Sequence, residues 1–160
     1  ENTLDFISHQ VDAGADCIGI GDAFSSQIGP DLYYQYAFER EKAIVSHIHA
    51  LGAKAKLHIC GNTEAIIPGM IKTGADIIDI DHLVPSLEEF TPLLGPNQVF
   101  SGKCDPVSIV QSGSEESIRN AVASDYRASK GRCIISAGCE ITPETPAKNM
   151  IYFRDSRLLL

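Results

Sequence analysis

A recurring Gly-Ala-Asp tripeptide limits the folds open to this chain. Gly14-Ala15-Asp16 and Gly74-Ala75-Asp76 each lead into a short apolar run, and Leu51-Gly52-Ala53 does the same. The runs that follow the two tripeptides end at Asp22 and Asp81. A helix, a glycine turn, a buried strand and then a polar residue form the repeat unit of parallel α/β proteins. The sequence therefore predicts an α/β fold built on a parallel sheet.

Short apolar segments bounded by glycine or polar turns mark the strands, because strands buried on both faces have this character. The predicted strands are Asp16–Gly21, Lys56–Cys60, Asp76–Asp81, Gln98–Gly102 and Cys133–Ala137. Helix starts are predicted between them from proline and capping signals. They lie at Pro30-Asp31, at Pro85-Ser86 with Glu89, at Ser114 and at Thr145-Pro146.

Five such units fit either an open doubly wound sheet or part of a (β/α)₈ barrel. Gly19-Ile20-Gly21 does not continue into the G-x-G-x-x-G pattern of dinucleotide folds. Both architectures gather ligands at the carboxyl ends of their strands. No linker or low-complexity stretch divides the chain, so we expect a single domain over residues 1–160.

Composition excludes several classes of function. The chain has 160 residues, of which 44% are hydrophobic and 21% charged, which is ordinary for a globular domain. A net charge of −8 without a Lys/Arg cluster argues against nucleic acid as a partner. No apolar run reaches the length of a membrane span. An odd number of cysteines without scaffold spacing predicts a reducing, cytoplasmic setting.

The sharpest signal for chemistry is His58-Ile59-Cys60. Residues two apart on a strand project from the same face, so both side chains reach one side of the sheet near its carboxyl edge. Cys139 follows the last predicted strand and can meet them if both strands line one barrel. An imidazole and two thiolates suit zinc and leave a fourth position open. Isolated His and Cys residues at strand ends are also common in cores and rims, so the pattern alone leaves both interpretations open.

The sequence around these residues resembles the methylcobamide:coenzyme M methyltransferases of the uroporphyrinogen decarboxylase superfamily. The resemblance rests on His-x-Cys-Gly-Asn-Thr at residues 58–63, on Gly-x-x-Asp-Pro at 102–106, and on Cys139 ahead of Thr145–Asn149. Lys103 departs from the Gly-Asn that the family often shows. The resemblance implies a (β/α)₈ TIM-type barrel, of which this chain is the C-terminal portion of about five βα units, with the N-terminal part missing.

The resemblance also implies the chemistry. It assigns His58, Cys60 and Cys139 as ligands of Zn²⁺, and it implies transfer of a methyl group between a corrinoid on a partner protein and a small thiol such as coenzyme M. We expect Asp22 and Asp81, at the same mouth, to be catalytic by orienting the substrate or the ligands. The direction of transfer and the fourth ligand stay open.

Two other functions remain open at this stage. One is a metal-free decarboxylase-like enzyme acting on a tetrapyrrole. The other is a non-catalytic zinc-binding or assembly fragment. Five parallel strands cannot close a barrel of eight, and open apolar edges are normally covered. We therefore expect self-association or pairing with the rest of a longer polypeptide.

Overall fold

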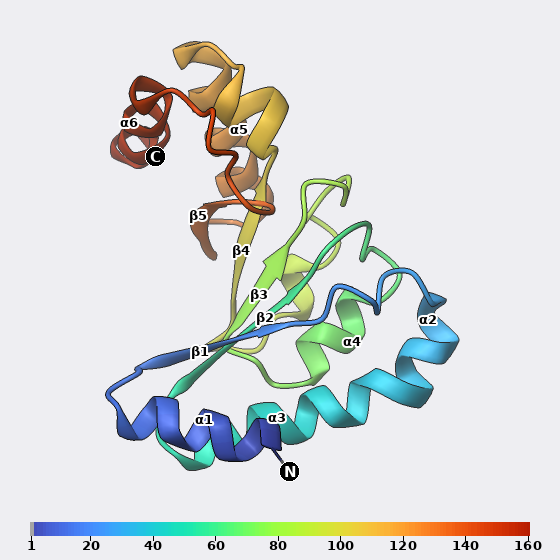
Figure 1. Cartoon of the computed structure of the whole chain (residues 1–160). Coiled ribbons are helices and arrows are strands. Elements are labelled where there is room, and N and C mark those ends of the chain that lie inside the picture. The colour runs from blue at the N-terminus through green and yellow to red at the C-terminus, as the bar shows by residue number, and fades with distance from the viewer. Residues whose placement is uncertain (1) are drawn as a thin grey trace.

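The structure, a computed structural model, describes residues 2–160 and contains one parallel sheet (Figure 1). Its strands are β1 (Cys17–Gly21), β2 (Lys54–Ile59), β3 (Ile77–Ile80), β4 (Val99–Cys104) and β5 (Cys133–Ala137). They follow one another in the sheet in chain order, and every neighbouring pair is parallel. Doubly wound sheets reverse this order at a switch point, whereas the wall of a (β/α)₈ barrel keeps it.

Helices connect the strands. They are α1 (Asn2–Asp12), α2 (Gly29–Leu32), α3 (Phe38–Ala50), α4 (Ile67–Lys72), α5 (Glu115–Ala128) and α6 (Ala147–Asp155). A π-helical turn, η1 (Tyr33–Ala37), joins α2 to α3, and a second, η3 (Pro106–Gln111), follows β4. Short 3₁₀ turns occur at η2 (Thr91–Leu93) and η4 (Ser156–Leu159).

Alternate residues of the strands face the helices and form the core. In β2, Ala55, Leu57 and Ile59 are fully or almost fully buried, whereas Lys56 and His58 on the other face are only half-buried. A first apolar cluster joins β1–β4 to α1, α3 and α4, and a second surrounds β5, α5 and α6. Figure 1 shows the same division, with α1 and α3 along one part of the sheet and α5 and α6 beside β5.

Most of the predicted elements are confirmed. The strands end within two residues of their predicted limits, and Ser114 caps α5 by accepting a hydrogen bond from the amide of Ser117 at 3.2 Å. The capping box at Pro85-Ser86 is wrong, because this segment forms turns that lead into η2. The segment instead forms a loop that buries its apolar residues Val84 and Leu87.

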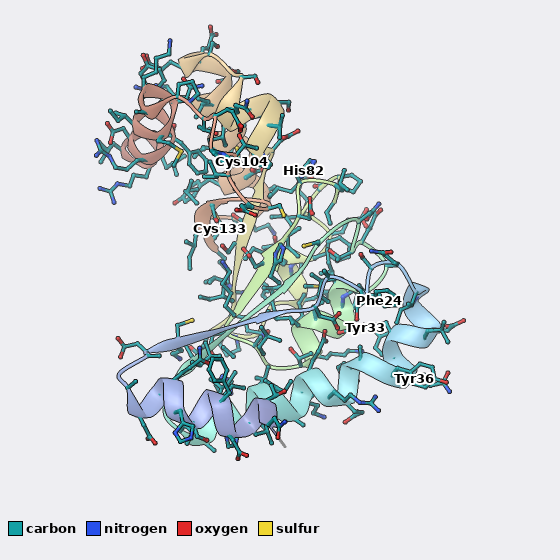
Figure 2. The ribbon with its side chains drawn as sticks, viewed as in Figure 1. Phe24, Tyr33, Tyr36, His82, Cys104 and Cys133 are labelled. Atoms are coloured by element: carbon teal, nitrogen blue, oxygen red, sulfur yellow. The ribbon has the colours of Figure 1, made fainter. Side chains whose placement is uncertain are left out.

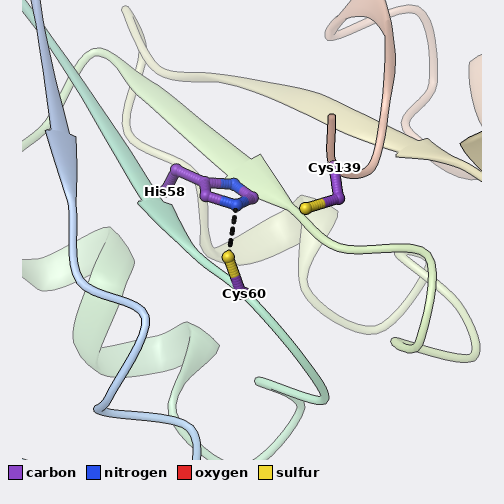
Figure 3. A group of neighbouring side chains, drawn as sticks. All are labelled: His58, Cys60 and Cys139. Atoms are coloured by element: carbon purple, nitrogen blue, oxygen red, sulfur yellow. Dashed lines mark hydrogen bonds between the residues drawn. The ribbon is translucent and has the colours of Figure 1, made fainter. Parts of the chain in front are cut away.

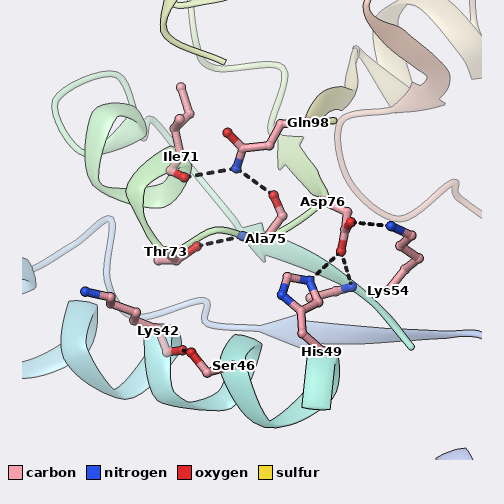
Figure 4. A network of polar contacts seen from close by, with 10 residues as sticks. Lys42, Ser46, His49, Lys54, Ile71, Thr73, Ala75, Asp76 and Gln98 are labelled. Carbon is pink, nitrogen blue, oxygen red and sulfur yellow. Dashed lines mark hydrogen bonds and ion pairs between the residues drawn. The ribbon is translucent and has the colours of Figure 1, made fainter. Parts of the chain in front are cut away.

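A polar network closes the amino end of the sheet (Figure 4). The carboxylate of Asp76 lies 2.7 Å from Nε2 of His49 and 2.8 Å from Nζ of Lys54, and it accepts the amide hydrogen of Ala55 at 2.9 Å. The third residue of the Gly-Ala-Asp tripeptide thus ties β2 to the turn before β3. Burial would raise the pKa of Asp76, but these hydrogen bonds lower it to about 2.

We predict that Asp76→Asn will lower the free energy of unfolding at pH 7 by about 1–2 kcal/mol, because it removes hydrogen bonds to an ionised carboxylate. An Asp whose pKa falls on folding stabilises the fold above its unfolded pKa of about 3.9, and this stabilisation is lost as the pH falls toward the folded value. Urea unfolding at pH 7, 4 and 2 should therefore show that the free energies of unfolding of the variant and the original protein converge as the pH falls to 2.

Asp155→Asn is the matched control, because the Asp155 carboxylate forms its ion pair with the exposed Arg154. It should change the stability at pH 7 much less than Asp76→Asn. Equal effects of the two substitutions would contradict the role assigned to Asp76.

Candidate metal centre

His58, Cys60 and Cys139 converge at the carboxyl end of the sheet (Figure 3). Their donor atoms all lie within 4.8 Å of one another, and Nε2 of His58 lies 3.1 Å from Sγ of Cys60. The first two come from the end of β2, and Cys139 comes from the loop after β5. The structure therefore brings together the three residues that the sequence singled out as metal ligands.

The Cys60 side of the site is fixed by the turn that follows β2. Gly61 has a φ of 90°, a backbone conformation that favours glycine. Its amide donates a hydrogen bond of 2.7 Å to Oδ2 of Asp81, which is almost fully buried. Asp81 therefore anchors the backbone directly after Cys60.

The Cys139 side depends on close backbone packing. The amide of Gly138 donates to the carbonyl of Cys104 at 2.8 Å. A Cβ added at Gly138 would overlap the backbone of Asp81 and His82. Only glycine lets this loop approach the end of β3, which is how Cys139 reaches His58 and Cys60 across β3 and β4.

The electrostatics of the site suit a cation. Burial raises the pKa of the Cys60 thiol, and the neighbouring Cys139 and Asp81 raise it further because negative charges repel. The Asp79 carboxylate, 3.1 Å from Nδ1, raises the pKa of His58, against an opposing effect of burial. A divalent cation would reverse the repulsion between the thiolates.

The donor set fits zinc in type and in spacing. Thiolate sulfur and imidazole nitrogen are zinc's preferred donors, and tetrahedral zinc holds its ligand atoms about 3.5–4 Å apart. Donor atoms within 4.8 Å of one another need only a small movement to reach that geometry. The three protein donors leave one tetrahedral position for another ligand.

Asp22 and Asp81 lie at the same end of the sheet as predicted, but most of their contacts are with backbone amides. The amide of Asp22 donates to the carbonyl of His58 at 2.9 Å, which places the two residues side by side. The Asp22 carboxylate accepts hydrogen bonds from the amides of Phe24 and Ser25 and from the Ser25 hydroxyl. These contacts order the loop after β1. A catalytic role for Asp22 and Asp81 stays a prediction.

The sequence reasoning missed Asp79. It lies on the open face of β3, paired in register with His58 on one side and Ser101 on the other. Its Oδ2 lies 3.1 Å from Nδ1 of His58 and 3.0 Å from Nζ of Lys56. The available signal was a carboxylate inside an otherwise apolar strand, because such a residue needs a partner when it is buried.

The remaining cysteines, His82 and Lys103 lie in or beside the strands. Cys104 of β4 is buried and Cys133 of β5 is half-buried (Figure 2), whereas Cys17 is exposed on the open face of the edge strand β1. His82 contacts the Asp81 carboxylate through Nδ1 at 2.7 Å. Lys103, which departs from the family pattern, has a φ of 80°, a conformation strained for lysine.

The family of the chain is shown by the match of a family model. The model described as uroporphyrinogen decarboxylase (URO-D) matches residues 1–157, and the chain belongs to this family. Among curated proteins, a methylcobamide:CoM methyltransferase MtbA from Methanosarcina acetivorans is 36% identical over 88% of this chain and 41% of its own length. A uroporphyrinogen decarboxylase from Prochlorococcus marinus is 28% identical over 96% of this chain and 43% of its own length.

Solved structures show the same fold. A methyltransferase from Methanosarcina mazei matches with a TM-score of 0.86 and 22% identity, over 98% of this chain and 45% of its own. A B12-independent methionine synthase from Shewanella matches with a TM-score of 0.70 and 16% identity, over 99% and 55%. The chain thus forms part of a (β/α)₈ barrel, and it spans about two fifths of the length of the curated relatives above. None of the helices within residues 2–160 has the length and apolar character needed to cross a membrane.

We predict that Gly138→Ala will separate Cys139 from Cys60, because the added methyl group displaces the loop from the backbone of His82. Mild oxidation of metal-free protein should form a Cys60–Cys139 disulfide about 10- to 100-fold more slowly in the variant, since the two thiols lose their alignment. Mass-spectrometric mapping of disulfides over time measures this rate.

Gly19→Ala provides the control, because an added Cβ there meets no atom within 4 Å. Its disulfide should form at the original rate. A Gly138→Ala variant that also forms the disulfide at the original rate would show that the close packing of this loop is not needed.

Proposed function

We propose that this chain carries the zinc-binding wall of a corrinoid-dependent methyltransferase. In this proposal His58, Cys60 and Cys139 hold Zn²⁺, and the complete enzyme moves a methyl group between a methylcobamide on a corrinoid protein and a thiol such as coenzyme M. The observation that carries the proposal is the convergence of one imidazole and two thiols within 4.8 Å at the ligand-binding end of a barrel wall. The similarity to a methylcobamide:CoM methyltransferase supports the choice of substrates.

The residues of the site have distinct roles in this chemistry. When bound, zinc supplies Lewis-acid stabilisation that keeps a substrate thiol deprotonated at neutral pH. Cys60 and Cys139 would contribute two thiolates to the metal site, and their electron density would keep a bound substrate thiolate nucleophilic. Asp81 holds the turn after Cys60, and Asp22 orders the loop beside His58. Both aspartates thereby fix the loops that surround the metal site.

A metal-free, decarboxylase-like activity on a tetrapyrrole is less well supported. Arginines would have to clamp the carboxylates of such a substrate. Arg132 instead donates to the backbone carbonyls of Leu94, Gly95 and Gln98, and Arg119 pairs with Glu115 on the surface of α5. Nothing in that activity requires two thiols and an imidazole to converge.

The open edges of β1 and β5 are surfaces that we expect further strands to cover. Within the sheet of the described residues each of these strands has a neighbour on one side only. Unpaired strand edges invite pairing with further strands. We propose that the remaining barrel wall, or a second copy of the chain, covers them and completes the surroundings of the corrinoid.

The first prediction from this proposal is stoichiometric zinc. Purified protein should retain about one zinc per chain after desalting, as a site with three protein ligands does. Cys60→Ala should abolish this binding because it removes one of two thiolates. Elemental analysis by mass spectrometry measures the ratio.

Cys17→Ala is the matched control, since Cys17 is also a free cysteine on the open face of the sheet but lies outside the cluster. It should retain zinc fully. Folded, metal-free protein that takes up no added zinc would rule out the site.

The second prediction concerns the thiol. Binding of coenzyme M to the zinc-loaded chain should release a proton, because the bound form is the thiolate. Calorimetric titrations in buffers of different ionisation enthalpy measure this release. Ethanesulfonate, which lacks the thiol, serves as the control ligand. Thiol binding without proton release would show that zinc does not activate the acceptor thiol.

A further inference from the structure

We propose that Asp79 is a positioning residue that holds the His58 ring by its Nδ1 edge, so that Nε2 is the atom presented to the metal. This inference rests on the proposed zinc site and adds to it a residue outside the three ligands. It also fixes which of the two imidazole nitrogens is the ligand.

The orientation of the ring carries the argument. Nε2 of His58 lies 3.1 Å from Sγ of Cys60 and so points into the cluster, as Figure 3 shows. Nδ1 points away from it and lies 3.1 Å from Oδ2 of Asp79. The Nδ1 atom is buried and makes no aligned hydrogen bond with the described residues, which leaves the Asp79 carboxylate at 3.1 Å as the group that faces it. A hydrogen on Nδ1 leaves the lone pair on Nε2, which is the form of imidazole that binds a metal.

Asp79 is itself held in position. Parallel pairing sets His58 directly beside Asp79 in the sheet, and the next neighbour in that row is Ser101. Lys56, on the same face of β2 as His58, lies 3.0 Å from Oδ2 of Asp79. The side chain of Asp79 is only 9% exposed, so Lys56 offsets much of the cost of burying its charge.

The packing of β3 does not explain why a carboxylate stands at position 79. The other residues of β3, Ile77, Ile78 and Ile80, are apolar, and an apolar residue at position 79 would avoid the cost of burying a charge. Buried groups that cost stability tend to be retained for function. A carboxylate behind a ligand histidine both fixes the ring and strengthens its donor nitrogen.

Zinc affinity of the full chain tests the proposal. Competition with a chromophoric chelator should show that Asp79→Ala weakens zinc binding about 10- to 100-fold, the usual effect of losing a partner of a ligand histidine. Asp79→Asn keeps an oxygen that can accept from Nδ1 and should lose less. Asp125→Asn is the control, because it removes another partly buried carboxylate beside the sheet, outside the cluster. It should bind zinc as the original protein does.

Nitrogen NMR of zinc-loaded original protein gives an independent reading and needs no variant to fold. We expect the metal shift on Nε2 of His58 and the proton on Nδ1. Metal on Nδ1, or equal zinc affinity in folded Asp79→Ala, would overturn the role of Asp79 while leaving the zinc site intact. If the original protein binds no zinc, the proposed function fails instead. In that case the Nδ1 proton in metal-free protein decides whether Asp79 still orients the ring.

Discussion

The parallel pairing of β2 with β3 is the constraint on which the site depends. This register sets His58 beside Asp79 and ends both strands at the same edge. The turn after β2 can then donate the Gly61 amide to Asp81 at the end of β3. A shift of one residue would turn His58 into the core and Leu57 into the mouth, because side chains alternate between faces. The buried Ala55, Leu57 and Ile59 oppose such a shift, so the apolar core fixes the geometry of the polar site.

The sequence predicted the framework well because its signals were local. Gly-Ala-Asp tripeptides, short apolar runs and the Ser114 cap are each decided by a few adjacent residues, and the structure follows them closely. The convergence of Cys139 with the His58 pair needed more than local signals. It followed from the hypothesis of a barrel, in which every strand ends at the same mouth.

Features set by contacts between distant segments were not predictable in this way. The sequence marks Asp79 only as a carboxylate in an apolar strand, and its partners His58 and Lys56 are known once the register is known. Gly138 resembles any loop glycine, yet its lack of a side chain is what brings two backbones together. The capping box at Ser86 failed for the opposite reason. Its local signal favours a helix, but Val84 and Leu87 are buried in the core without one.

The positions of the three donors also matter for how the molecule holds together. His58 and Cys60 belong to the strand beside the larger apolar cluster, and Cys139 follows the strand that belongs to the smaller one. A metal bound by all three would act as a staple across β3 and β4, closing a long loop of chain and restricting the unfolded state. The two clusters would then unfold as one cooperative unit, and loss of the metal would let the region around β5, α5 and α6 open on its own.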